Sequence, residues 1–119
     1  MALKYDFTVV QSISDSIAVE IVNSAGTPVN LSGKLFQLDC RQNHNTEVPY
    51  FSLSSSSNTL ILDTHQNNKI HLVFTHEMTS QLNFDKGTYD LIGYLPDKSE
   101  VNLLMSGTVT LQKTVTRLA

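Results

Sequence analysis

The 119-residue sequence has no tryptophan, one cysteine and few charged residues. The single cysteine, Cys40, excludes an intrachain disulfide framework. Charged residues make up only 16% of the chain, whereas about 25% is usual in soluble domains. The eight Lys and Arg residues are scattered singly and the net charge is −3, which argues against a nucleic-acid-binding surface. No apolar run reaches the roughly 18 residues that a membrane-spanning helix needs.

Uncharged polar residues fill the place of the missing charges. The chain holds 13 Ser, 12 Thr, 9 Asn and 6 Gln. A weakly charged surface has few charges to desolvate when it packs against a neighbour, which favours a part in an assembly. An ordinary polar β-domain fits this composition equally well. The first seven residues, Met1–Phe7, lack the apolar stretch of a signal peptide, so we expect synthesis in a cytoplasm rather than secretion.

Alternation of apolar and polar residues with a period of two runs along the whole chain. Turn residues interrupt it about every 8 to 12 positions, which is typical of an all-β sandwich or barrel. We predict one domain over residues 1–119, with eight or nine strands and one short helical turn. The expected strands are Tyr5–Gln11, Ile17–Ile21, Phe36–Arg41, Val48–Leu53, Leu60–Asp63, Lys69–Phe74, Gly87–Leu95 and Val101–Val115. Gly107 lies inside the last of these, where it predicts a bulge or bend.

The segment from Thr75 to Tyr89 predicts the crossing from one sheet to the other. Thr75 can cap a helical turn whose inner side ends at Leu82, and a glycine turn at Gly87 opens the strand that carries Tyr89. In β-sandwiches a buried tyrosine at this place can hydrogen-bond back to the crossing loop. We therefore expect Leu82, Gly87 and Tyr89 to form a structural corner, with the Tyr89 hydroxyl bonded to that loop.

None of the sequence motifs predicts catalysis. His76 and Glu77 resemble the start of a zinc-protease helix, but that motif requires a second histidine where this chain has Ser80. The chain also lacks a Gly-x-Ser-x-Gly elbow, a glycine-rich phosphate loop and an Asp-x-Asp calcium loop. We therefore expect no catalytic, cofactor-binding or metal site and no enzymatic activity. A metal site would require His65, His71 and His76 to converge in space.

Two residues with reactive or charged side chains have structural interpretations. Cys40 alternates with Phe36 and Leu38, which predicts a buried thiol. Arg41 and Asp90 fall on the polar sides of their strands, which suggests a cross-strand ion pair between them.

Three aromatic residues are candidates for a binding surface. Tyr50 and Phe51 follow Pro49 on an expected edge strand, and Tyr94 ends another strand. Aromatic residues are enriched in the cores of protein interfaces. Clustered on one concave face, the same three residues would instead suggest carbohydrate or host-surface recognition, although the absence of tryptophan argues against sugar binding.

Six short segments carry a family resemblance through their order along the chain. They are Thr27–Gly33, Phe36–Arg41, Thr79–Leu82, Gly87–Asp90, Leu103–Val109 and Val115–Arg117. Read in this order, they resemble a family of small tail-associated structural proteins of bacteriophages, and the resemblance covers most of the chain from Thr27 onward. It implies an immunoglobulin-like β-sandwich that serves as a virion building block in the tail, baseplate or neck, made in the host cytoplasm. The implied partners are other virion proteins or further copies of the chain in a ring.

Overall fold

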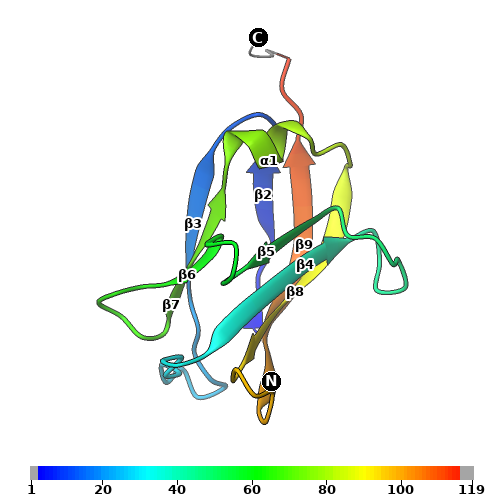
Figure 1. Cartoon of the computed structure of the whole chain (residues 1–119). Helices are drawn as coiled ribbons and strands as arrows, with labels where there is room; N and C mark the ends of the chain where they lie inside the picture. The colour runs from blue at the N-terminus through cyan, green and yellow to red at the C-terminus, as the bar shows by residue number, and fades with distance from the viewer. Residues whose placement is uncertain (1–2, 116–119) are drawn as a thin grey trace.

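The computed structural model describes residues 3–115, which form two β-sheets packed face to face and one short helix (Figure 1). The larger sheet has the strand order β1-β9-β8-β4-β5, with β2 also paired to β9, and the smaller sheet has the order β3-β7-β6. This architecture confirms the predicted immunoglobulin-like β-sandwich. The elements are β1 (Leu3–Lys4), β2 (Phe7–Val10), β3 (Asp15–Glu20), β4 (Leu35–Arg41), β5 (Phe51–Ser54), β6 (Leu60–Leu62), β7 (Lys69–Phe74), α1 (His76–Ser80), β8 (Lys86–Tyr94) and β9 (Val101–Gln112).

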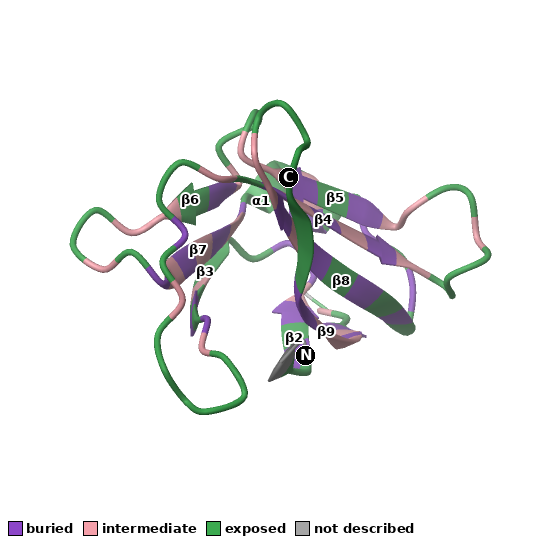
Figure 2. Ribbon diagram, turned by 90° about the horizontal axis from the view of Figure 1, so that it is seen from below, coloured by how far each residue is buried: buried purple, intermediate pink, exposed green. Residues whose placement is uncertain are grey.

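The core lies between the sheets and follows the sequence alternation. Buried residues alternate with half-buried or exposed ones along β4, β7 and β8, as the striped strands in Figure 2 show. Phe74 of β7 contacts two rings of the larger sheet, Phe7 with ring centroids 6.0 Å apart and Phe51 at 5.6 Å. These aromatic contacts join the two layers. Cys40 is fully buried in this core, as predicted, and burial raises the pKa of its thiol to about 12.

The first predicted strand, Tyr5–Gln11, is shorter in the structure, where it is β2, and the separate strand β1 precedes it. β1 and β2 both run parallel to β9, and residues 5 and 6 separate them. The other strand pairs in the described part of the chain are antiparallel. After β2 a tight turn carries the chain to the smaller sheet, with Ser12 at a φ of 66°.

The predicted corner residues Leu82, Gly87 and Tyr89 are all buried, but their contacts differ from the expectation. Tyr89 is buried, yet its hydroxyl donates to the backbone carbonyl of Tyr5, between β1 and β2, at 2.5 Å. The prediction that it bonds to the crossing loop was wrong, because the tyrosine points along the inner face toward the edge where β1 and β2 meet β9. Burial, with Asp6 and Tyr5 nearby, raises the pKa of the Tyr89 hydroxyl, so it keeps the proton that it donates.

Hydrogen bonds join two of the segments that cross between the sheets, the β7–β8 crossing and the β2–β3 turn. Thr75 caps α1, as predicted, by accepting a hydrogen bond from the Met78 backbone N–H at 3.2 Å. The fully buried Thr79 donates its hydroxyl hydrogen to the Ile13 carbonyl at 3.0 Å. Gln11 donates from Nε2 to the carbonyl of the buried Leu82 at 2.8 Å. These bonds tie the β7–β8 crossing to the β2–β3 turn.

Gly87 lies within β8 rather than in a turn, so its predicted role is corrected. A Cβ atom at this position would lie 2.6 Å from Cys40 Sγ and 3.0 Å from the Arg41 carbonyl oxygen. The residue is buried, and its missing side chain lets β4 and β8 pack closely.

Candidate functional site

The outer face of the larger sheet carries two kinds of surface. Its outward residues on β4, β8 and β9 form four cross-strand rows, as the register of the strands shows. The first two rows are mostly apolar and the next two are polar. In that order the rows are Leu35–Tyr94–Val101, Gln37–Ile92–Leu103, Asp39–Asp90–Ser106 and Arg41–Thr88–Thr108.

A β-bulge creates the apolar rows. Leu91 pairs with Met105 and Ile92 pairs with Leu103, so Leu104 is an extra residue in β9. Leu104 and Met105 are both buried, and residues before them change faces. Without this extra residue, Leu103 and Val101 would point into the core. The bulge lies at Leu104 and not at Gly107, where the sequence suggested one.

Gly107 has a different role from the predicted bend. It pairs with Tyr89 inside β9, and a Cβ atom there would overlap the Tyr5 carbonyl oxygen and lie 2.8 Å from Asp6 Oδ1. Its missing side chain therefore makes room for the chain between β1 and β2.

We call the five apolar residues of the first two rows the apolar block. Val101 is 57% exposed, Leu103 51% and Leu35 38%. Ile92 and Tyr94 are half-buried between them on the central strand β8. Single exposed apolar residues are ordinary, but five neighbours on one sheet face form a contiguous patch of the kind that marks interaction sites.

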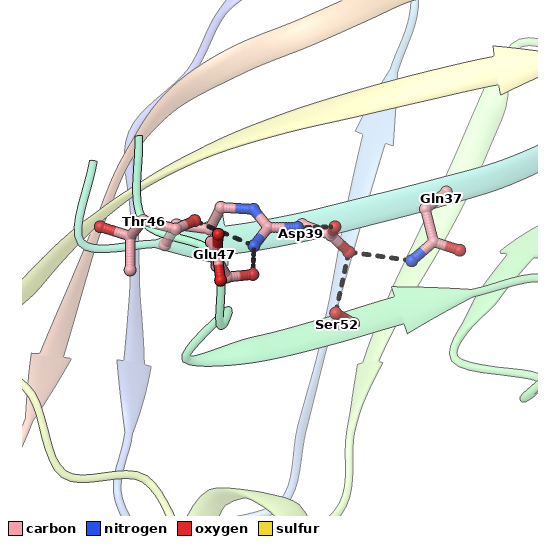
Figure 3. A network of polar contacts seen from close by, with 6 residues as sticks. Gln37, Asp39, Thr46, Glu47 and Ser52 are labelled. Atoms are coloured by element: carbon pink, nitrogen blue, oxygen red, sulfur yellow. Dashed lines mark hydrogen bonds and ion pairs between the residues drawn. The ribbon is translucent and has the colours of Figure 1, made fainter. Parts of the chain in front are cut away.

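A hydrogen-bonded network occupies the polar half of the face (Figure 3). The Asp39 carboxylate accepts from Gln37 Nε2 at 2.9 Å, Ser52 Oγ at 2.8 Å and Arg41 Nη2 at 2.8 Å. Burial acts to raise the pKa of Asp39, but the hydrogen bonds from Gln37, Ser52 and Arg41 outweigh it and hold the pKa below its ordinary value. Asp39 is therefore an ionised structural acceptor with its oxygens engaged.

Arg41 connects this network to the β4–β5 loop. Its Nη1 donates to the backbone carbonyls of Thr46, at 3.1 Å, and Glu47. The predicted ion pair between Arg41 and Asp90 was wrong, since Arg41 pairs with Asp39 two residues away on its own strand. Asp90 lies opposite Asp39 on the neighbouring strand, so the arginine side chain reaches the nearer carboxylate.

A shallow hollow of about 280 Å³ lies beside this network. It is lined by Asp39, Arg41, His44, Thr88, Tyr89 and Asp90. The network side chains are bonded to each other and to backbone, and no serine, threonine or cysteine nucleophile with a partnered base is among them. The side chains that line the hollow thus offer polar contacts.

We expect the Arg41→Ala variant to loosen the 42–49 loop. The substitution removes two charge-assisted bonds to loop carbonyls and leaves Asp39 without its cation, and should lower the free energy of unfolding by about 1–2 kcal/mol. Faster amide hydrogen exchange at Thr46 and neighbouring loop residues would show the loosening. Arg41→Lys is the matched control. It keeps the positive charge but lacks the planar guanidinium group that bonds both carbonyls and Asp39, so its exchange rate should lie between those of the wild type and Arg41→Ala. Unchanged exchange in Arg41→Ala would contradict this role.

The three predicted aromatic contact residues do not share a surface. Phe51 is only 6% exposed and faces the core, so its prediction as a surface residue was wrong. Tyr50 is half-buried and stacks on Phe84 with ring centroids 4.3 Å apart. Tyr94 alone lies in the apolar block, and it pairs with Leu35, at the end of β4 opposite to Tyr50.

Sequence reasoning missed the four aliphatic members of the apolar block. The sequence carried a signal for three of them, Leu35, Ile92 and Leu103, in the form of consecutive apolar residues, which place one side chain on each face of a strand. Leu35–Phe36 and Leu91–Ile92 are such pairs, and Leu103–Met105 is an apolar triplet that fits a bulge.

His71 and His76, two of the three histidines that a metal site would require, lie apart from this face, on β7 and α1. His76 bonds through Nδ1 to the Ser12 carbonyl at 2.7 Å, and His71 bonds through Nε2 to Asp63 Oδ1 at 2.8 Å. The hydrogen bond from His71, together with the His65 backbone N–H, lowers the pKa of Asp63 to about 2. Among residues 3–115, no three His, Cys, Asp or Glu side chains gather in a way that could hold a metal ion.

Comparisons with known proteins give a likeness of fold only. No protein-family model matches the chain, and no curated protein matches it. Among solved structures, a marsupial T cell receptor chain is similar with a TM-score of 0.47 and 16% sequence identity. The match covers 99% of this chain and 53% of the receptor chain, so this chain spans about half the length of that protein. In the part of the chain that the structure describes, no helix is long and apolar enough to cross a membrane.

Proposed function

We propose that this chain is a non-enzymatic structural component of a bacteriophage particle, in the tail, baseplate or neck, and that it acts through protein–protein contacts. The observation that carries this proposal is the apolar block on the outer face of the larger sheet. The sequence resemblance to phage tail-associated proteins supports placing the chain in a bacteriophage particle. In that setting the chain is made in the bacterial host cytoplasm and becomes part of the virion, where its partners are other virion proteins or further copies of itself.

The polar half of the same face supports contact rather than reaction. The Asp39 and Arg41 groups are satisfied within the chain, so they can meet a partner without leaving an unpaired charge. A rigid sandwich keeps such a face in one shape. In a particle, neighbouring domains are held at high local concentration, so modest contacts add up.

The alternative, a host-surface or carbohydrate-recognition module, depends on an aromatic platform. Tyr50, Phe51 and Tyr94 lie in different places, one of them inside the core. We therefore put forward the contact role alone.

The proposal is tested by locating the chain in particles. An antibody raised against the purified chain should label the tail, baseplate or neck of phage particles from cells that carry this sequence, seen by immunogold electron microscopy. The antigen should also sediment with intact particles in a density gradient. Antigen found only in the non-sedimenting fraction would overturn the proposal, as would turnover of an ester, glycoside or phosphate substrate that one side-chain substitution abolishes.

A further inference from the structure

We infer that the apolar block is the docking surface for a second copy of this chain, related to the first by a twofold axis that runs along β8. This inference rests on the proposed function, because it names one partner for a chain that acts by contact.

The block has the symmetry that such a contact needs. Ile92 and Tyr94 lie on the central strand β8, with Leu35 on the β4 side and Val101 and Leu103 on the β9 side. Rotation by 180° about an axis along β8 exchanges these two sides. Leu35 of each copy then faces Val101 of the other, and the two Tyr94 rings meet near the axis. In the first row both flanks are aliphatic, and in the second row Gln37 of each copy faces Leu103 of the other. The surface is therefore complementary to itself chiefly through the first row.

Charges at the edge of the block also favour self-docking. Lys34 precedes Leu35 on the β4 side, Glu100 precedes Val101 on the β9 side, and their side chains form an ion pair at 2.8 Å. The same rotation brings each of these charges toward the opposite charge of the second copy. Because Lys34 and Glu100 neutralise each other, this pair offers no unpaired charge to a strongly acidic or basic partner.

The next row limits the size of the contact. Asp90 is exposed and lies in the third row, where the rotation would place it near Asp90 of the second copy. Like charges there confine the contact to the two apolar rows. Three strands and two rows span about 10 Å by about 7 Å between backbone positions. The area of this patch is well below the roughly 800 Å² that each partner buries in a standard interface. We therefore expect a weak dimer, with a dissociation constant between about 1 µM and 1 mM.

Sedimentation velocity across this concentration range tests the dimer. The weight-average mass of the wild type should rise from monomer toward dimer with concentration. Leu103→Lys places a charge inside the contact and should weaken dimerisation ~10-fold or more. Ile61→Lys is the matched control, because Ile61 is 44% exposed on β6 of the other sheet and its substitution should leave dimerisation unchanged. A wild type that stays monomeric, or a dimer that Leu103→Lys leaves intact, overturns the inference.

Cross-linking tests the twofold arrangement. Cys40, the one native cysteine, is fully buried, so Tyr94→Cys introduces a single accessible thiol. A short bis-maleimide reagent should link two copies of Tyr94→Cys and should not link two copies of Ile61→Cys. Equal yields in both variants would overturn the arrangement. If the antibody labels particles while the wild type is monomeric, self-docking fails and the proposed function stands. If the wild type dimerises but the antibody labels no particles, self-docking stands and the proposed function fails.

Discussion

Phe74→Ala is expected to lower the free energy of unfolding by about 3–5 kcal/mol, the usual cost of removing a large buried aromatic side chain. Phe74 is 1% exposed at the end of β7, where its ring contacts Phe7 of β2 and Phe51 of β5. The substitution therefore leaves a cavity between the two sheets and removes two aromatic contacts that join them. Urea denaturation would show a lower midpoint with an unchanged slope if the folded state stays compact.

The neighbouring residue gives a matched control for Phe74. Val73 lies on the same strand with its side chain on the outer face, and it is half-buried. Val73→Ala should cost about 1 kcal/mol or less, as is common for sites outside the core. If Phe74→Ala and Val73→Ala were equally destabilising, the two sheets would not depend on the aromatic contacts at Phe74.

Gly107→Ala is expected to destabilise the protein by about 2–3 kcal/mol, the range of overpacking in a site that cannot relax. The added Cβ would overlap the Tyr5 carbonyl oxygen and lie 2.8 Å from Tyr5 C and from Asp6 Oδ1. Backbone cannot move aside as a flexible side chain can. The displacement would also strain the hydrogen bond from Tyr89 to the same carbonyl. Thermal unfolding followed by circular dichroism would measure the loss.

Two further variants separate the causes of this effect. Tyr89→Phe removes only the hydroxyl and should cost about 1–1.5 kcal/mol, the net value of one hydrogen bond. Gly93→Ala also introduces a close contact, but with the end of the Leu104 side chain, Cδ1 at 2.8 Å, so it should cost less than Gly107→Ala. A harmless Gly107→Ala would mean that the chain between β1 and β2 is free to move away from β9.

Strands with regular alternation were predictable from sequence. In β4, β7 and β8 one set of alternate residues is apolar, and burial of that set outweighs other influences on the backbone. The capped helical turn was equally local, because Thr75 bonds to a backbone group only three residues away. The hairpin of β6 and β7 around residues 65–68 also followed from short-range turn signals.

The partners of polar side chains were not predictable. Tyr89 bonds to a residue 84 positions away, and Gln11 to one 71 positions away. Arg41 had two carboxylates within plausible reach, and only the register of β4 with β8 and the course of the 42–49 loop decide between them. Phe51 was wrongly expected at the surface because alternation on a short edge strand does not say which set faces inward.

The sequence by itself determined an all-β sandwich with a buried thiol at Cys40 and a capped crossing at Thr75, because hydrophobic periodicity and local hydrogen bonding act over a few residues. Only the tertiary structure decided where the surface for contact lies. Leu35, Ile92 and Leu103 come from three separated strands, and the single extra residue at Leu104 turns Leu103 outward. Which side chains share a face depends on register between strands, and register is a property of the whole sheet.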